Sequence, residues 1–266
     1  MFLLLFILGC FIGSFLGVLV DRLPHNETVV KGRSRCEFCR KELKVLDLIP
    51  VLSFISTRGK CRYCKHALSI FYPAIELSTG ILFVLTYLFA VATFQSLITS
   101  PLTLITLIYN LLVVSGFIVI FFMDLKYGII LDKILLPLIA IITLFLALFN
   151  PQALLINLVC GISAFLFFLI VSFGFKFIRG KEGMGGGDIK LAFVLGLFLG
   201  FPNIIVALYV AFLTGAIAGF ILILWKKKNL KNTTLPFGPF LILGALICLF
   251  WGNLILPKLL LFLGLT

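Results

Sequence analysis

The sequence predicts an all-α polytopic membrane protein of about eight transmembrane helices, with a small loop domain near its N-terminus. Three observations support this prediction. The 266 residues are 62% hydrophobic with a mean hydropathy of +1.25, whereas soluble domains are about 45–50% apolar. Apolar runs of about 18 residues or more recur, and a run of that length crosses a bilayer as a helix. The basic residues lie in short segments between these runs, as topology determinants do.

The apolar runs predict eight membrane helices in chain order. The first run has no basic residue before it and is followed by Arg22, the reverse of a secretory signal, so we expect an uncleaved helix with its N-terminus outside. The sixth run is short, and its separation from the seventh rests on a turn at Gly200 and Pro202, so seven helices remain an alternative. The expected ranges are 1–20, 74–94, 102–123, 129–149, 153–175, 189–200, 202–225 and 238–263.

Lysine and arginine lie almost entirely on one side of this arrangement. With eight alternating spans, that side comprises 21–73, 124–128, 176–188 and 226–237 with the adjoining helix ends. It holds 21 of the 22 basic residues, and the exception is Lys258. By the positive-inside rule this side is cytoplasmic. Topology therefore accounts for the net charge of +12, and we expect a lipid bilayer and no nucleic acid as a partner.

Two cysteine pairs lie in the first and longest loop. Cys36 and Cys39 form one C-x2-C motif and Cys61 and Cys64 the other, with 21 residues between the pairs. Four thiolates suit tetrahedral Zn²⁺, and a reducing cytoplasm disfavours disulfides. A redox dithiol or a chance pairing is the alternative. Residues 21–73 are therefore predicted to be a small cytoplasmic zinc-binding Cys-rich domain, whose structural metal a loop of this size needs in order to fold.

Two aspartates lie at the cytoplasmic edges of apolar runs. Asp124 ends one run, and Asp188 follows a glycine cluster and opens the next. Two carboxyls at one depth can share a proton and activate water between them, because like charges in close approach raise one of the two pKa values. Gly185 and Gly187 allow the chain to bend sharply and its backbone to approach a substrate strand. Each aspartate alone is equally compatible with a helix cap or a helix end.

The helix dipole predicts which aspartate is ionised. Asp124 lies at a helix C-terminus, where negative charge is disfavoured, and Asp188 lies at a helix N-terminus, where it is favoured. We therefore expect Asp188 to be the anion and Asp124 its protonated partner. Glu76 lies just inside the second helix, either as a carboxylate stabilised by the helix dipole or as a polar contact of the site.

Taken in order, these motifs resemble the type IV prepilin peptidases, a family of GxGD intramembrane aspartyl proteases. The resemblance covers nearly the whole chain. The sequence departs from the family at Leu131, where proline is common, and at Gly17 and Phe71, where asparagine and arginine are frequent. The matching segments are Gly13-Ser14-Phe15, Arg22-Leu23-Pro24, the paired cysteines, Tyr72-Pro73 with Glu76 and Gly80, Gly185 to Asp188 with Lys190-Leu191, and Pro236 to Phe240.

The resemblance implies an activity and a role for each matching residue. It implies cleavage of the basic leader of prepilins or pseudopilins at the cytoplasmic face of a bacterial inner membrane. It also implies N-methylation of the new N-terminus with S-adenosylmethionine, because the cysteine loop marks the longer, often bifunctional form. Residues 1–20 are then the first transmembrane helix and 74–266 a membrane-embedded aspartyl peptidase domain. The implied roles are catalysis by Asp124 and Asp188, support of substrate or loop by Gly185, Gly187, Glu76 and Lys190, and metal binding by Cys36, Cys39, Cys61 and Cys64.

Two other functional classes remain open at this point. A transporter would place ionisable residues in mid-helix near the bilayer midplane, whereas the acids here lie at one edge. A non-catalytic zinc-bearing assembly factor for a pilus or secretion system would share the cysteine loop but would process no prepilin.

Overall fold

The computed structural model describes most of the chain as two compact units, Met1–Phe122 and Met123–Thr266. Each unit is described by itself below. The boundary falls inside one helix, so residues 123–127 of that helix belong to the second unit. The structure describes all residues except 30–33, 37, 95–100, 181–183, 226–235 and 263–266.

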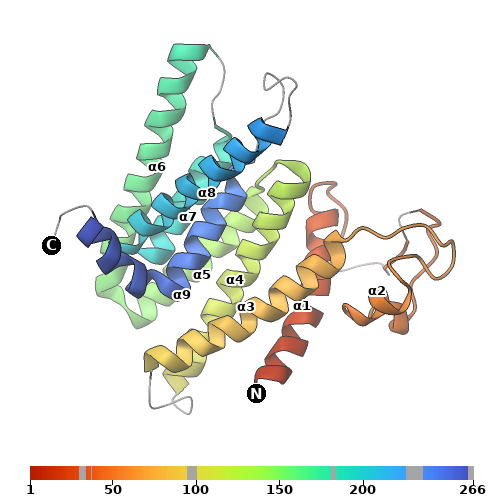
Figure 1. Cartoon of the computed structure of the whole chain (residues 1–266). Helices are drawn as coiled ribbons and strands as arrows, with labels where there is room; N and C mark the ends of the chain where they lie inside the picture. Colours follow the sequence, from red (N-terminus) through yellow and green to blue (C-terminus); the bar gives the residue numbers. More distant parts are fainter. Residues whose placement is uncertain (30–33, 37, 95–100, 181–183, 226–235, 263–266) are drawn as a thin grey trace. The chain divides into compact units, whose positions relative to one another are not determined.

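Over the described residues the regular structure is helical, with two isolated β-bridges in the first loop. The predicted all-α fold class is therefore confirmed. In chain order the elements are α1 (Phe2–Arg22), η1 (Val45–Asp47), α2 (Leu52–Ser56), α3 (Phe71–Phe94), α4 (Pro101–Tyr127), α5 (Asp132–Phe149), α6 (Pro151–Arg179), α7 (Gly186–Leu199), α8 (Asn203–Trp225) and α9 (Gly238–Phe262) (Figure 1).

Seven of the described helices are long and apolar enough to cross a membrane, namely α1, α3, α4, α5, α6, α8 and α9. The remaining long helix, α7, has 14 residues, or about 21 Å, which is shorter than the hydrocarbon core of about 30 Å. The expected count of eight spans is thus not confirmed. Seven, the alternative, matches the number of helices with sufficient length.

The helix boundaries follow the expected ranges to within a few residues, with one correction that matters for chemistry. Helix α4 continues to Tyr127, so Asp124 lies inside its last turn and 124–127 is not a loop. The helix ends at Gly128, which has φ of 66° and donates its N–H to the carbonyl of Asp124 at 2.8 Å. A left-handed glycine of this kind is a common helix C-cap, because no Cβ opposes the conformation.

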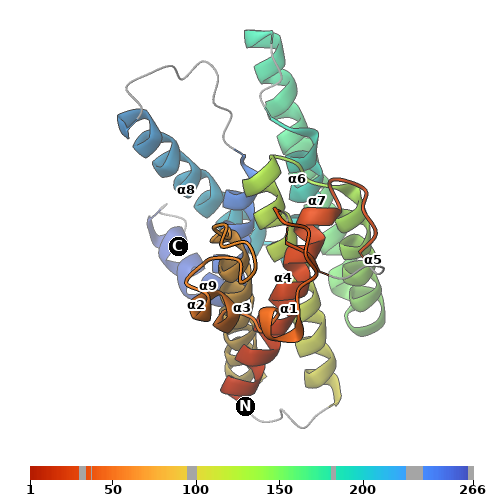
Figure 2. The ribbon, with the colours of Figure 1, turned by 90° about the vertical axis from the view of Figure 1, so that its right-hand side faces the viewer.

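In the first unit, α1 and α3 pack side by side (Figures 1 and 2). Small residues allow their backbones to approach closely, which suits helix association in lipid. A Cβ at Gly13 would lie only 2.8 Å from the Cα of Glu76. At the cytoplasmic ends expected from the sequence, the hydroxyl of Tyr72 donates to Asp21 at 2.8 Å. These contacts place Gly13, Glu76 and Tyr72 of the sequence motifs where α1 meets α3.

In the second unit, α7 packs against α5, α6 and α9, and α8 packs along α9. Helices α6 and α7 approach closely, and a Cβ at Gly196 would lie 2.7 Å from the Cα of Gly161. Helix α7 is apolar on all sides and buried along most of its length, as expected for a helix surrounded by others. Its buried residues are Asp188, Ile189, Leu191, Ala192, Val194, Leu195, Gly196 and Leu197.

Candidate aspartyl dyad and cysteine metal centre

Asp124 and Asp188 belong to the second unit, and both are buried, with 4% and 9% of their surface exposed. Asp124 lies in the last turn of α4, and Asp188 is the third residue of α7. The two carboxyls are close enough for their charges to interact. The N–H of Asp188 donates to the carbonyl of Gly185 at 3.1 Å, which fixes the first turn of α7.

Gly238, the first residue of α9, completes this arrangement. Its backbone amide faces both carboxyl groups. A Cβ at this position would lie 2.5 Å from Oδ2 of Asp124, so only glycine permits the approach. The helix N-termini of α7 and α9 therefore both lie at the carboxyls, and unpaired N–H groups at such ends favour negative charge.

One carboxylate oxygen of this pair is left open. Within the described residues, Oδ2 of Asp124 is buried and has no hydrogen-bond partner. A buried carboxyl oxygen without a partner loses its hydration without compensation, which destabilises the fold. Such an atom at the edge of a helix bundle is suited to hold a water or a substrate group.

The glycine cluster meets the α4–α5 connection. A Cβ at Gly187 would lie 2.8 Å from Cβ of Ile130, and one at Gly238 would lie 3.1 Å from Cδ1 of the same side chain. Ile130 is thus packed against both glycine-containing helix starts. Gly185 is more open, because a Cβ there would lie 3.6 Å from the nearer Asp188 oxygen. Gly187 is therefore required for close packing, whereas the structure gives Gly185 no comparable constraint.

Lys190 forms an ion pair with Asp132, in which Nζ lies 2.8 Å from both carboxylate oxygens. The pair links the start of α5 to the first turns of α7. Both side chains are about half exposed, at 53% and 56%, and exposed ion pairs contribute little stability. The lysine expected to support substrate or loop therefore has a salt-bridge partner within its own unit.

Glu76 lies in the first unit, where it holds the loop domain to α3. Its Oε2 accepts the backbone N–H of Val51 at 2.7 Å, and the hydroxyl of Ser14 on α1 also hydrogen-bonds to the carboxyl. Val51 has φ of 60° and ψ of −48°, which is strained for a β-branched residue by about 1–3 kcal/mol. The bond from Glu76 helps to hold this turn.

The four motif cysteines converge in the first unit. Their sulfur atoms all lie within 4.8 Å of one another, and Cys36 Sγ is 4.0 Å from Cys64 Sγ. Tetrahedral zinc with bonds of about 2.3 Å separates its sulfur ligands by about 3.8 Å, so the cluster fits that ion with small adjustments. The described cysteines are all free thiols rather than disulfides.

The two cysteine pairs form equivalent turns, a repeat that was not expected from the sequence. The N–H of Cys36 donates to the carbonyl of Lys41, and the N–H of Cys61 donates to that of His66 five residues on in the same way. The residue after each second cysteine, Arg40 or Lys65, has a positive φ, 55° or 60°.

Aromatic and cationic side chains cross between the two turns. Phe38 of the first stacks on His66 of the second at 4.2 Å between ring centroids. Lys41 of the first lies 4.5 Å from the ring centre of Tyr63 in the second, where a cation–π contact is favourable. In each contact, the side chain two residues after the first cysteine of one turn meets the side chain five residues after the first cysteine of the other turn. Exchanging the two turns therefore exchanges the two contacts, so the centre has an approximate two-fold symmetry.

The thiols have unequal proton affinities. Burial raises the pKa of Cys61, but hydrogen bonds from the backbone of Cys64 and Tyr63 outweigh it and lower the pKa to about 7. A hydrogen bond from the backbone of His66 lowers the pKa of Cys64, yet burial and the neighbouring sulfurs raise it overall. Four thiolates so close together would repel one another unless a cation lay between them, so this cluster could hold a metal ion only as the thiols lose their protons.

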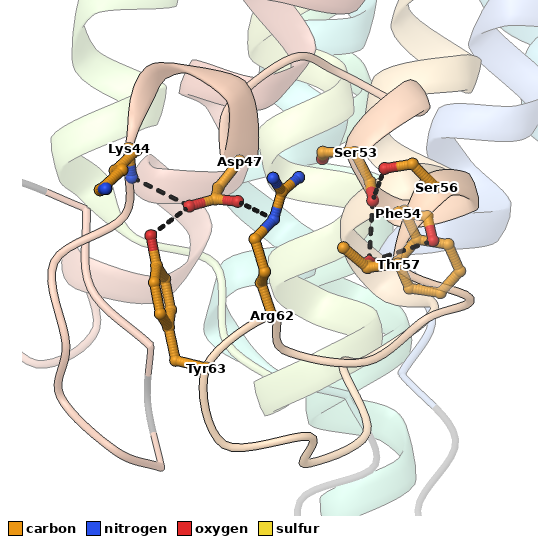
Figure 3. Close-up of polar contacts among 8 residues, drawn as sticks. All are labelled: Lys44, Asp47, Ser53, Phe54, Ser56, Thr57, Arg62 and Tyr63. Carbon is orange, nitrogen blue, oxygen red and sulfur yellow. Dashed lines mark hydrogen bonds and ion pairs between the residues drawn. The ribbon is translucent and has the colours of Figure 1, made fainter.

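Asp47 anchors the second cysteine turn to η1 (Figure 3). Its carboxylate accepts from the hydroxyl of Tyr63 at 2.9 Å and from the backbone N–H of Lys44 at 3.0 Å, and it forms an ion pair with Nε of Arg62 at 2.9 Å. Only 8% of the Asp47 side chain is exposed. The loop domain thus has a buried polar centre next to its thiols.

Sequence reasoning gave no individual role to three residues that these contacts single out. Gly238 was signalled only by the motif Pro236 to Phe240, and nothing in the sequence connected it with the aspartates. Ile130 is one apolar residue among many, so it carried no signal. Asp47 is an acid in a basic loop, which was a weak indication of a structural partner.

Two family models match the chain. Residues 7–90 match the bacterial peptidase A24 N-terminal domain, and residues 111–220 match the type IV leader peptidase family. The first range covers the α1–α3 pair and the cysteine loop, and the second covers both aspartates and the glycine cluster. No solved structure matches the chain.

Several curated proteins match the chain over most of their length. The chain is 33% identical to a prepilin leader peptidase/N-methyltransferase of Bacillus subtilis over 95% of both chains. It is 32% identical to one of Aeromonas hydrophila, over 95% of this chain and 91% of the other. It is 31% identical to one of Burkholderia pseudomallei, over 93% and 84%. With two matching family models and these identities, the chain belongs to the type IV leader peptidase family.

Proposed function

We propose that this protein is a prepilin peptidase that removes the basic leader of type IV prepilins or pseudopilins, with Asp124 and Asp188 as its catalytic dyad. Family membership supports the activity. One observation supports the dyad: the two buried carboxyls meet at the N-terminus of α9, and one oxygen is unpaired. Burying two carboxyls is costly unless they have partners or a chemical role, so the arrangement favours catalysis.

In the proposed reaction one carboxyl is ionised and the other protonated. The ionised carboxyl takes a proton from water while the water oxygen bonds to the scissile carbonyl carbon, and the protonated carboxyl donates to the carbonyl oxygen. When the C–N bond breaks, the carboxyl that took the proton from water gives it to the leaving nitrogen, and the other carboxylate regains its proton from a hydroxyl of the tetrahedral intermediate as the carbonyl forms again. We assign the anion to Asp188, because it lies at the N-terminus of α7 whereas Asp124 lies at the C-terminus of α4. The N-terminus of α9 also favours negative charge on Asp124, so the difference between the two aspartates is smaller than α4 and α7 alone would give.

We propose that the four cysteines bind a structural Zn²⁺. All four tetrahedral positions are then filled by protein, so the ion supplies cross-linking and no open site for chemistry. In the described part of the loop, from residue 23 to residue 70, Cys36, Pro50 and Cys61 are the only residues buried as a whole, main chain included. A domain with so small a core depends on its metal to fold.

N-methylation of the new N-terminus is proposed as a second activity. The names of the relatives and the cysteine loop support it. S-adenosylmethionine would supply an electrophilic methyl group to the amine that cleavage releases. We assign no side chain of this chain to that step.

We place the protein in a bacterial inner membrane with its N-terminus outside and the dyad at the cytoplasmic face. Seven described helices long enough to span a membrane support a multi-pass protein. The choice of sides rests on eight alternating spans in which α7 also crosses, because 21 of the 22 basic residues then lie on one side. A prepilin carries a basic leader before an apolar helix, so the same rule leaves its leader in the cytoplasm. Substrate and dyad would then meet at one membrane face.

Cleavage of a purified prepilin tests this proposal. Detergent-purified wild type, Asp124→Asn and Asp188→Asn are incubated with prepilin, and product masses are measured. We expect wild type to remove the leader and each variant to lose at least about a thousandfold in rate, since acid–base groups contribute 10²–10⁴ each. A further methyl mass with S-adenosylmethionine present would establish the second activity.

Asp132→Asn is the matched control, because Asp132 is an exposed acid of the same unit that forms an ion pair with Lys190. It should retain cleavage. Normal cleavage by both Asp124→Asn and Asp188→Asn would refute the dyad. Ion flux in liposomes without cleavage by wild type would instead support the transporter alternative.

A further inference from the structure

The loop domain exposes an apolar helix face to its surroundings. Leu52 and Ile55 of α2 are each 64% exposed, and residues three apart lie on the same side of a helix. The adjoining η1 exposes Val45 and Leu46, at 81% and 61%. We call Leu52 and Ile55 the apolar face of α2. In a water-soluble segment a cluster of this kind indicates an interaction surface.

The contact between Glu76 and Val51 fixes the depth of this face. Glu76 is the sixth residue of α3, about 7 Å along its axis from the start. Helix α3 has 24 residues, about 36 Å, which only slightly exceeds the hydrocarbon core of about 30 Å. Val51, held by Glu76, therefore lies near the border between head groups and acyl chains. Leu52 follows it directly.

The ribbon agrees with this depth. Figures 1 and 2 both show α2 beside the α1–α3 pair rather than beyond its end. Both ends of the loop continue into membrane helices, α1 at Arg22 and α3 at Phe71. The bilayer is therefore always within reach of α2. Its effective concentration at α2 is higher than that of a partner free in solution.

Charge around α2 suits an anionic surface. Residues 21–73 contain eleven basic and five acidic residues. Exposed Arg58 and Lys60 follow α2, and exposed Lys44 precedes η1. Basic residues beside an inserted apolar face are typical of segments that lie in the interface of anionic membranes.

We propose that α2 lies in the interfacial region of the adjacent bilayer leaflet, with Leu52 and Ile55 among the acyl chains and with Arg58, Lys60 and Lys44 on anionic lipid phosphates. The thiol centre is then held at the membrane surface by lipid as well as by Glu76. This inference depends on the membrane placement of α1 and α3 and not on peptidase activity.

Tryptophan quenching in lipid nanodiscs tests the proposal. Trp225 and Trp251 are first replaced by phenylalanine in the full chain. Leu52→Trp or Ile55→Trp is then added, so that each variant has a single tryptophan, and each nanodisc holds one copy of the protein. The discs contain anionic lipids brominated near the head group or deep in the chain. We expect the tryptophan emission of both variants to be blue-shifted and to be protected from quenching by acrylamide in the water. We also expect bromines near the head group to quench it several-fold more strongly than they quench Ala67→Trp. Ala67 is an exposed residue of the second cysteine turn and serves as the matched control.

Zinc content equal to that of the parent verifies that each variant is folded. Adding Arg58→Gln or Lys60→Gln should lower the ratio of inserted to free α2 about fivefold per removed charge in anionic discs and leave it unchanged in neutral discs. Quenching equal to that of the Ala67→Trp control overturns the proposal. If the tryptophan is shielded from acrylamide only when prepilin is added, the apolar face of α2 binds substrate. If it is shielded only when a disc holds two copies of the protein, the face binds a second copy. Either of these results overturns the proposal as well.

Discussion

The cysteine loop and the helices around the aspartates are stabilised in opposite ways. In the loop, buried side chains are few and the centre consists of four thiols and Asp47 with its polar partners. Around α7, the buried surface is almost wholly apolar, and glycines bring helix backbones into contact. The difference shows that ion pairs, hydrogen bonds and a thiol cluster organise the segment outside the apolar spans, whereas close packing organises the helices within them.

The largest effect should come from removing one ligand in the first region. Cys61→Ser should lose its zinc and leave the loop open to protease, because a structural site in small zinc domains contributes about 10–16 kcal/mol. The helices of the second unit should remain protected. Metal analysis and limited proteolysis measure both.

Cys160→Ser is the control for that change, since Cys160 lies in α6 outside the thiol centre. It should keep full zinc. If Cys61→Ser kept one zinc per chain, Cys61 would not be an essential ligand, and if it lost zinc but kept a protected loop, the metal would not organise this region.

The second largest effect should come from a methyl group at the dyad. Gly238→Ala should lower kcat by about a hundredfold with little change in KM, because its Cβ would displace Asp124 Oδ2 and small displacements of reacting groups cost that much. Gly186→Ala is the matched control, since a Cβ there meets nothing within 4 Å. Equal rates for the two variants would contradict the packing of α9 against the dyad.

A smaller effect is expected at the polar centre of the loop. Asp47→Asn should destabilise the loop by about 1.5–3 kcal/mol, the range for hydrogen bonds to a charged group. Tyr63→Phe removes only one of its bonds and should cost about 1 kcal/mol. Protease susceptibility of the loop against denaturant gives both values, and an order of effects opposite to this one would exclude Asp47 as the anchor.

The smallest effect is expected at the exposed ion pair. Lys190→Met should change stability by about 0–1 kcal/mol, the range for exposed salt bridges, and should leave cleavage within a fewfold of wild type. A loss as large as that of Gly238→Ala would show that Lys190 acts on the substrate or the dyad, and not only on Asp132.

Some features could be predicted because their signals are local in the chain. The spans follow from the lengths of apolar runs, and the four cysteines follow from two spacings of the same kind. The aspartates and the glycine cluster stood out because charge is rare at the edges of apolar runs. The two cysteine turns also correspond to a repeat in the sequence, Cys36 to Lys41 and Cys61 to His66. A repeat of six residues is too short to predict that the two turns face each other.

Other features depended on which helix faces meet. Gly238 at the dyad and Glu76 on Val51 join segments that are distant in sequence. The sequence itself determined that this chain is a helical membrane protein with a thiol cluster and two edge aspartates, because length, polarity and spacing are properties of continuous segments. Only the tertiary structure decided that α7 is a short buried helix and that α9 begins at the aspartates. Helices that are apolar on every side carry no periodic pattern to show which side faces a neighbour.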